Sequence, residues 1–502
     1  MKIEELKILR GPNYWSIRRT KLIQMKLDLQ EMEQRPTNTI EGFGERLAAL
    51  FPSMYAHRCS VGEPGGFFKR VAEGTWMGHV IEHIALELQT LAGMNTGFGR
   101  TRGTGEPGKY FVVISYLEED AGIYAAKAAV KIAEALTDGT PYDLSEDIQQ
   151  LREIREDTRL GPSTGCIVEE AAKRGIPHLR LNKHSLVQLG YGVNQKRIRA
   201  TIASTTGNIA VDIACDKEET KNLLGAAEIP VPRGTVVRTI AGLEEAVEKF
   251  GYPLVIKPID GNHGKGNTTN ITTWEQAEKA FESAKLYGRS VIVEKFITGF
   301  DFRILVINYK FICAALRTPA SVVGDGVHTI QWLIDETNKD PRRGYGHEKV
   351  LTQITVDDST MKMLDEKGYT LETIPPTGEL VLLKTTANLS TGGTSTDVTD
   401  EVHPENIVMC ERIAKIIGLD ICGIDIMAQD LQTPVSSNGG AILEVNAAPG
   451  FRMHIDPTEG LGRNVAEPVI DMLFPDRSNG RIPIIAITGT NGKTTTTRLT
   501  AH

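Results

Sequence analysis

The segment 252-YPLVIKPIDGNHGKGNTTNI-271 constrains the fold of this chain more than any other stretch. An apolar run ends in Lys257 and Pro258 and passes directly into a turn that carries three glycines and a second lysine, namely Gly261, Gly264, Lys265 and Gly266. Glycine lets a backbone approach anionic oxygens closely, and lysine supplies charge for them. The pattern predicts a strand followed by a phosphate-binding loop, although a flexible hairpin with solvated lysines has the same composition.

The chain divides into three blocks around that loop. Residues 1–160 mix strands with helices and predict an α+β domain, whereas residues 161–475 alternate strand and helix and predict an α/β domain. A joint rich in Pro, Asp and Gly leads to the last block, 481–502, where an apolar strand runs into GTNGKTTTT. The phosphate-loop residues there are Gly489, Gly492, Lys493 and Thr494.

Composition excludes several classes of function. The net charge of −8 argues against a general nucleic-acid binder, and no apolar run approaches the roughly 18 residues of a membrane helix. The six cysteines include no CxxC pair and are typical of free thiols in a reducing compartment. We therefore expect a cytoplasmic protein with neither a nucleic-acid nor a membrane partner.

Further polar residues occur at strand-like segments on both sides of the Gly-rich turn. Lys217 opens a helix before it, and a strand after it ends in Glu294 and Lys295 and is followed by Asp301 and Arg303. Two later strands carry Asp425, Glu444 and Asn446. Glu444 and Asn446 are two residues apart and share a face, and oxygen ligands of these kinds suit Mg²⁺.

The order of these residues resembles the ATP-grasp superfamily, which includes D-alanine–D-alanine ligase and glutathione synthetase. The resemblance implies that Lys217 and Lys257 hold ATP phosphates, and that Asp425, Glu444 and Asn446 bind Mg²⁺. Glu294 and the backbone from Lys295 to Ile297 would meet the adenine. The other expected ATP contacts are Gly264, Lys265, Gly266 and Asp301. The implied reaction activates a carboxylate as an acyl phosphate, which an amine then attacks.

Two arginines are candidates for stabilising negative charge on that acyl phosphate. Arg303 follows the Gly-rich segment by one strand, and Arg452 lies in 441-AILEVNAAPGFRMH-454. A structural salt bridge is an equally good interpretation of either arginine. The segment 384-KTTANLSTGG-393 is rich in hydroxyls and amides, so we interpret it as an acceptor-binding loop or a plain surface loop.

The whole chain resembles the cyanophycin synthetase family. The matching stretches are LRGPNYWSIRR, GHVIEHIALELQ, GMNTGFGRTR, LVQLGYG, KPIDGNHGKG, TANLSTGG, EVNAAPGFRMH and the terminal GTNGKTTTT. In this family an ATP-grasp domain is followed by a Mur ligase-like domain, and the product is a poly-aspartate chain bearing arginine on its side chains. The resemblance implies that the ATP-grasp domain adds L-aspartate to a cyanophycin polymer or primer, and that the Mur-like domain adds L-arginine. We expect the chain to be truncated at the start of the Mur-like domain, and to form a homo-oligomer.

The N-terminal block contains a second candidate site. In 75-TWMGHVIEHIALELQTLAG-93, His79, Glu82 and His83 form H-x-x-E-H on a predicted helix. This is the inverzincin arrangement, with two histidines as Zn²⁺ ligands and a glutamate as general base. Glu87 continues the same row and is a candidate third ligand. A polar helix face with hydrogen-bonded histidines is the competing interpretation. The resemblance itself associates the N-terminal domain with holding the polymer, for which Arg18, Arg19 and residues 97–103 are candidates.

Three hypotheses therefore stand. The chain is a peptide-polymer synthetase of the ATP-grasp type, or another ATP-grasp amino-acid ligase similar to glutathione synthetase, or an inactive polymer-binding fragment. The N-terminal block and the terminal phosphate loop favour the first over the second.

Overall fold

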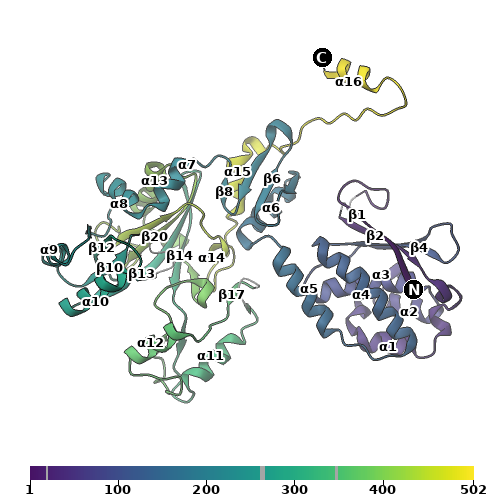
Figure 1. Cartoon of the computed structure of the whole chain (residues 1–502), viewed down its shortest axis with the longest axis horizontal. Helices are drawn as coiled ribbons and strands as arrows, with labels where there is room; N and C mark the ends of the chain where they lie inside the picture. Colours follow the sequence, from purple (N-terminus) through teal and green to yellow (C-terminus); the bar gives the residue numbers. More distant parts are fainter. Residues whose placement is uncertain (18–20, 260–265, 345–348, 502) are drawn as a thin grey trace. The chain divides into compact units, whose positions relative to one another are not determined.

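The computed structural model describes residues 1–17, 21–259, 266–344 and 349–501 (Figure 1). Of the predicted site residues, Gly264 and Lys265 lie outside these ranges, as do Gly261, Arg18 and Arg19. The chain separates into two compact units, Met1–Arg159 and Leu160–His502. Each unit is described by itself.

The first unit is an antiparallel sheet covered by helices on one face. Its strand order is β1-β2-β4-β3, with β1 Lys2–Leu9, β2 Leu22–Asp28, β3 Gly99–Gly103 and β4 Lys109–Ser115. The helices are α1 Phe43–Leu50, α2 Gly66–Glu73, α3 Met77–Leu91, α4 Glu119–Asp138 and α5 Ser145–Thr158. Alternate residues of the strands, such as Met25 and Val112, join Val80 and Ile84 of α3 in one buried core. That packing fixes α3, the helix of the H-x-x-E-H motif.

The second unit contains a four-stranded antiparallel sheet that carries the Gly-rich segment. Its order is β11-β10-β12-β9, with β9 Gly234–Val237, β10 Leu254–Pro258, β11 Thr268–Ile271 and β12 Val291–Lys295. The helices α9 Ile240–Phe250 and α10 Trp274–Lys285 pack on it, as Figure 1 shows. Lys257 is therefore the last residue but one of β10, and Glu294 lies on the neighbouring strand β12.

A five-stranded antiparallel sheet forms the centre of the same unit. Its order is β19-β14-β13-β20-β21, with β13 Phe300–Ile307, β14 Lys310–Thr318, β19 Thr394–Asp397, β20 Ile421–Ala428 and β21 Ala441–Asn446. Even-numbered residues of β13, such as Ile304, pack under α8 Lys217–Ala226 and α13 Pro404–Ile417. Odd-numbered residues face the other side, where Leu305 and Ile307 pack with α6 Pro162–Lys173 and α15 Ala466–Leu473. Asp301 and Arg303 share that second face because strand residues alternate between faces.

Smaller elements complete the second unit. A sheet of four short strands precedes these two sheets in the chain, with β5 His178–Arg180, β6 Leu186–Leu189, β7 Lys196–Arg199 and β8 Ile202–Ala203. A subdomain between β14 and β19 contains β15 Ser321–Val323, α11 Ile330–Asn338, β16 Arg343–Gly344, β17 Leu351–Thr352, α12 Asp358–Glu366 and β18 Leu380–Leu382. The remaining helices are α7 Asn208–Cys215, α14 Arg452–Ile455 and α16 Lys493–Ala501. The mixed α/β architecture predicted from the sequence is confirmed.

One predicted element is wrong. Residues 481–488, expected to form a strand before the terminal phosphate loop, have no regular structure, and Ile484 and Ile485 are exposed. A strand is stable only when a neighbour pairs with its backbone, and the described residues offer none to this segment. Among the described residues, no helix is long and apolar enough to cross a membrane.

Candidate active site

One pocket of the second unit collects predicted residues from four separate elements. It is lined by Lys217 of α8, Lys257 of β10, Glu294 of β12 and Glu444 of β21, together with Lys221, which the sequence analysis did not select. Apolar side chains complete the wall, namely Ala214, Leu224, Val231, Pro232, Ile442, Leu443 and Val445. The pocket thus combines a cationic side with an apolar surface, which suits a nucleotide's phosphates and base.

Glu294 is the central anion of this pocket. It is buried, and its carboxylate accepts hydrogen bonds from Lys221 Nζ at 2.9 Å and from Lys257 Nζ at 2.6 Å. Burial alone would raise the pKa of Glu294, but the charges of Lys257 and Lys221 hold it below its ordinary value. Glu294 therefore stays ionised and fixes two ammonium groups at one point. The resemblance to the ATP-grasp superfamily implies that Glu294 meets the adenine, and among the described residues its carboxylate contacts the two lysines.

Glu444 of β21 is the second acidic residue of the pocket wall. Lys217 Nζ lies 3.6 Å from Glu444 Oε2. Asp425 is paired with Glu444 in the register of β20 and β21, and Gly423 is paired with Asn446. The side-chain amide nitrogen of Asn446 is buried without a hydrogen-bond partner among the described residues. Because the two ends of such an amide are interchangeable, the same position can present an oxygen to a cation. The residues present therefore fit Mg²⁺, which prefers oxygen ligands.

Asp425 is also the acceptor of two arginines. Arg303, opposite it on β13, donates from Nε and from Nη2, the latter at 3.1 Å. Arg317 of β14 lies with its Nη2 3.1 Å from Asp425 Oδ2 and 2.5 Å from Asp301 Oδ1. Burial raises the pKa of Asp301 even though Arg317 pairs with it. Asp301, predicted as an ATP contact, is thus tied into this ion-pair network together with Arg303.

The other predicted ATP contacts lie at or just beyond the ends of strands in the four-stranded sheet. The backbone N–H groups of Lys295 and Phe296 donate to Arg233 O at 2.8 Å and Pro253 O at 3.0 Å, so both are used within the fold. Ile297 follows them in a half-buried loop. Gly266 has φ +72°, and a Cβ there would lie 2.6 Å from the Tyr287 ring, which explains glycine at this position.

Arg452 and His454 lie in α14, on the same face of the central sheet as Arg303. Burial lowers the pKa of Arg452, and its Nη2 lies 3.4 Å from Thr352 Oγ1. His454 is buried, and its Nε2 has no hydrogen-bond partner among the described residues. Burial, with a further contribution from the charge of Arg303, lowers the pKa of His454 to about 3. The imidazole is therefore neutral at ordinary pH.

The terminal phosphate loop does not join this site. Gly489, Gly492, Lys493 and Thr494 are all exposed, and Lys493 Nζ donates to the carbonyl of Gly489 at 2.6 Å. The lysine thus binds to its own loop. Helix α16 begins at Lys493, as expected for a helix after such a loop.

The H-x-x-E-H helix of the first unit lines a separate cavity of about 700 Å³. His79, His83 and Cys59 each offer a ligand atom, and the three atoms lie within 4.8 Å of one another. His79 Nε2 is 3.2 Å from Cys59 Sγ, and its Nδ1 is 3.0 Å from Thr75 Oγ1. One sulfur and two nitrogens suit Zn²⁺, and a hydroxyl on the second ring nitrogen orients such a ligand.

The remaining acidic residues of this cavity have distinct partners. Glu82 accepts from Thr101 Oγ1 at 2.7 Å, and burial raises its pKa to about 7. Glu87, the predicted third ligand, is outside the group. It lies 2.7 Å from His57 Nε2 and also accepts from Ser53, so it belongs to a neighbouring hydrogen-bond network. The third atom that could ligate a metal beside the two histidines is the Cys59 sulfur.

Four residues of the two sites, Lys221, Arg317, Cys59 and His57, were not predicted from the sequence. Lys221 had a usable signal, because it stands four positions after Lys217 on one helix face. Arg317 could have been found only through strand pairing. Cys59 and His57 precede the motif by about 20 residues, and the loop that returns them to α3 has no sequence signature. All six cysteines are free thiols, and Cys215 is exposed.

Comparison with known proteins covers both units. Residues 24–138 match the family model of the cyanophycin synthase-like N-terminal domain, and residues 222–315 match that of the ATP-grasp domain. The chain is 55% identical over 506 residues to a cyanophycin synthetase of Trichormus variabilis (strain ATCC 29413 / PCC 7937), with 100% of this chain and 56% of that protein covered. A cyanophycin synthetase of Synechocystis sp. (strain ATCC 27184 / PCC 6803 / Kazusa) is 54% identical over 508 residues, with 100% and 58% covered.

Glutathione enzymes are more distant. A glutathione biosynthesis bifunctional protein of Clostridium perfringens (strain 13 / Type A) is 32% identical over 320 residues, with 62% of this chain and 41% of that protein covered. The crystal structure of a bifunctional glutathione synthetase from Pasteurella multocida gives a TM-score of 0.52 at 28% identity, with 72% of this chain and 52% of that chain covered. This chain spans little more than half the length of the cyanophycin synthetases it matches. With its two matched domains and its similarity along the whole chain, it is related to the cyanophycin synthetases, as its sequence motifs predicted.

Proposed function

We propose that the unit Leu160–His502 is an ATP-dependent carboxylate–amine ligase that adds L-aspartate to a cyanophycin chain. The pocket in which Lys217, Lys221 and Lys257 meet Glu294 and Glu444 carries this proposal. Phosphoryl transfer depends mainly on positioning and charge neutralisation, and this pocket supplies both. The similarity to cyanophycin synthetases extends over the whole chain, whereas that to the glutathione protein covers 62% of it, which favours the polymer as substrate.

The reaction has two steps in this proposal. The carboxylate at the end of the polymer attacks the γ-phosphorus of ATP, which forms an acyl phosphate and releases ADP. The amine of L-aspartate then attacks the acyl carbon, so that a C–N bond forms, phosphate leaves and a proton passes to solvent. The lysines neutralise the phosphates, and Arg303 and Arg452 are candidates for holding the acyl phosphate. Asp425, Glu444 and Asn446 would hold Mg²⁺, which supplies further neutralising charge when bound.

An ADP-release assay tests this function. The full chain is supplied with ATP, Mg²⁺ and a panel of amino acids, each with and without a cyanophycin primer. We expect ADP release with L-aspartate and primer together. Release with glycine and a γ-glutamyl dipeptide would identify a glutathione-type ligase instead. No release with any combination would leave the chain as a polymer-binding fragment.

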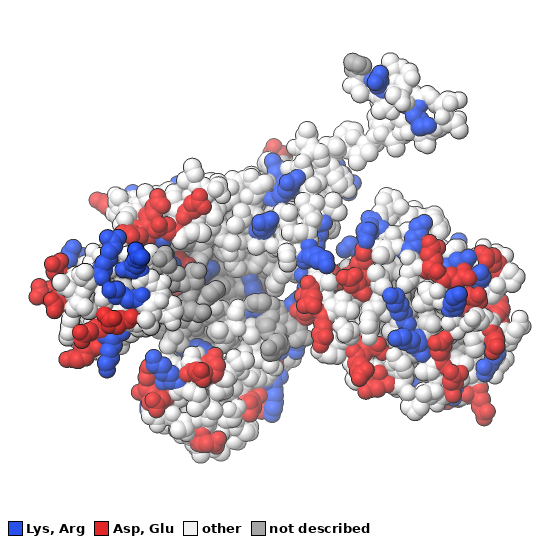
Figure 2. All heavy atoms as spheres, viewed as in Figure 1, with Lys and Arg blue, Asp and Glu red and all other residues white. Residues whose placement is uncertain are grey.

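We further propose that Cys59, His79 and His83 hold Zn²⁺ and that Glu82 acts as general base in hydrolysis of the polymer. The three ligand atoms within 4.8 Å favour this second function, and Glu82 lines the same cavity. Zinc, when bound, makes a water molecule more acidic and so more reactive. In Figure 2 acidic and basic side chains lie side by side over the visible face of the unit Met1–Arg159. Such a surface suits a polymer that carries both charges.

Metal analysis of the purified chain tests the second function. We expect about one Zn²⁺ per chain, lost in Cys59→Ser and His79→Ala but kept in Glu82→Gln, which should stop cleavage of the polymer. Cys215→Ser, at an exposed cysteine of the other unit, is the matched control and should keep its zinc. A wild-type chain that takes up no Zn²⁺ on addition would refute the proposal.

A further inference from the structure

Arg343 is held by its backbone at a defined place beside the hydroxyl-rich loop 384–393. It lies in β16, which pairs in parallel with β17, so that Arg343 is opposite Leu351 and Gly344 is opposite Thr352. Its backbone N–H donates to Asp340 O at 2.8 Å. The side chain therefore starts from a fixed point rather than from a free loop.

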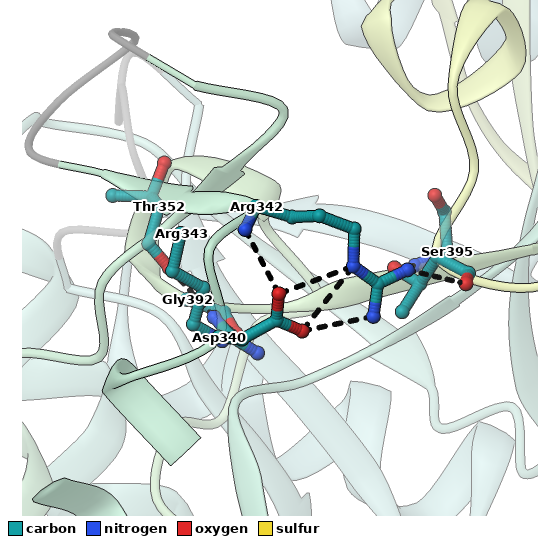
Figure 3. Close-up of polar contacts among 7 residues, drawn as sticks. Asp340, Arg342, Arg343, Thr352, Gly392 and Ser395 are labelled. Atoms are coloured by element: carbon teal, nitrogen blue, oxygen red, sulfur yellow. Dashed lines mark hydrogen bonds and ion pairs between the residues drawn. The ribbon is translucent and has the colours of Figure 1, made fainter. Parts of the chain in front are cut away.

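The neighbouring Arg342 forms an ion pair with Asp340. Arg342 donates from Nε to both carboxylate oxygens of Asp340 at 3.2 Å and from Nη2 to Oδ2 at 2.9 Å. Its Nη1 reaches the carbonyl of Thr458 at 3.1 Å. Figure 3 shows Arg342 turned toward Asp340, while Arg343 lies with Thr352 and Gly392. Asp340 is thus already occupied and does not pair with Arg343.

Arg343 instead has carbonyl groups as partners. Only 6% of the residue is exposed, and its Nη1 donates to Thr352 O at 2.6 Å and to Gly392 O at 3.1 Å. No carboxylate of the described residues forms an ion pair with it, in contrast to Arg303, Arg317 and Arg463 of the same unit. Burial lowers the pKa of Arg343, and the charge of nearby Asp340 offsets this only in part.

Two nitrogens of the Arg343 guanidinium, Nε and Nη2, donate no hydrogen bond to the described residues. Within the described part of the chain, nothing accepts from its Nε or Nη2, yet neither atom is among the fully buried polar atoms without a partner. Those two nitrogens therefore keep contact with solvent. A guanidinium presents two parallel N–H groups that match the two oxygens of a carboxylate.

A second arginine reaches the same residue. Arg452 of α14 contacts the hydroxyl of Thr352 while Arg343 contacts its carbonyl. Two positive charges thus meet at Thr352, next to Gly392 at the end of the loop 384–393. The same helix α14 carries His454 near Arg303, so this cationic site adjoins the face of the sheet that holds Asp425.

We propose that Arg343, with Arg452 beside it, binds the side-chain carboxylate of the L-aspartate substrate, a group that neutral amino acids lack. The inference rests on the proposed ligase function for the identity of the ligand. A bound carboxylate supplies the counter-ion that Arg343 lacks, and it brings the amine of the amino acid to the edge of the site where the acyl phosphate forms. Arg343 then accounts for selection of an acidic amino acid over a neutral one.

Calorimetric titration of L-aspartate into the full chain tests this binding without turnover. Arg343→Gln should weaken the affinity for L-aspartate about ten- to hundred-fold, the usual loss for a hydrogen bond to a charged group. Arg343→Lys keeps the charge but not the paired donors, so its loss should be smaller. Arg342→Gln is the matched control and should bind L-aspartate as the wild type does. The affinity for the primer should be the same in all four proteins.

Several results would overturn the proposal. These are an unchanged affinity for L-aspartate in Arg343→Gln, a weakened affinity for the primer instead, or no binding of L-aspartate by the wild type. A fall in Tm of more than about 10 °C in Arg343→Lys would show that the residue only holds the loop, and would also overturn it. Aspartate binding that depends on Arg343, in a chain that releases no ADP, would refute the ligase function alone.

Discussion

Arg303 and Asp425 face each other across the β13–β20 pairing, and the guanidinium donates two hydrogen bonds to the carboxylate. Both side chains are nearly buried, at 10% and 13% exposed. Arg317 reaches the same carboxylate from β14. The expected Mg²⁺ ligand Asp425 is therefore also the counter-ion of two arginines, which gives it a structural role besides its proposed catalytic one.

Asp425→Asn should destabilise the second unit by about 3 kcal/mol, because removal of one partner leaves buried charge uncompensated. Urea unfolding at neutral pH measures the change. Asp365→Asn, at an exposed position of α12, should stay within about 0.5 kcal/mol of the wild type. Equal stabilities of the two variants would show that the Asp425 ion pairs contribute nothing.

Lys221→Ala and Lys257→Ala should each reduce ADP release about 100-fold or more, because each removes a positive charge from the phosphate side of the pocket. Glu294 keeps its other lysine partner in each variant, so the fold should persist, as circular dichroism would show. Lys279→Ala, at an exposed position of α10, should release ADP at the wild-type rate. Normal turnover in Lys221→Ala would remove that residue from the site.

Glu444→Gln should raise the Mg²⁺ concentration needed for half-maximal ADP release about tenfold, because one anionic ligand becomes neutral. A Mg²⁺ titration at saturating ATP measures this, and Glu366→Gln at an exposed position provides the comparison. Superimposable titration curves for the wild type and Glu444→Gln would place the metal elsewhere.

His454 should make the protein less stable as the pH falls. Burial lowers its pKa to about 3, well below the ordinary 6.5, so the unfolded chain takes up a proton that the folded chain refuses. Above pH 6.5 this group does not affect the free energy of unfolding. As the pH falls from 6.5 toward 3, the free energy of unfolding decreases by up to about 1.4 kcal/mol per pH unit. Urea unfolding at pH 7 and pH 5 should show a smaller difference for His454→Gln than for the wild type. An identical pH dependence would mean that His454 is not held neutral.

The sequence predicted the local elements well, because their signals are local. The strand before Lys257, the helix that opens at Lys217 and the helix of H-x-x-E-H all follow from apolar patterning and turn residues. The order in which the strands pair could not be predicted from the sequence. The ion pairs of Arg317 with Asp301 and Asp425 were therefore missed. The strand expected within residues 481–488 failed for a related reason, because patterning indicates a strand but pairing stabilises it.

Incorporation of labelled L-aspartate into a cyanophycin primer tests the central claim most directly. The full chain, ATP, Mg²⁺ and primer are incubated together, and labelled primer and ADP are counted in the same sample. We expect one ADP for each aspartate joined, with both signals lost in Lys257→Ala. ADP release without label in the primer, or label that enters the primer equally in Lys257→Ala, would contradict it.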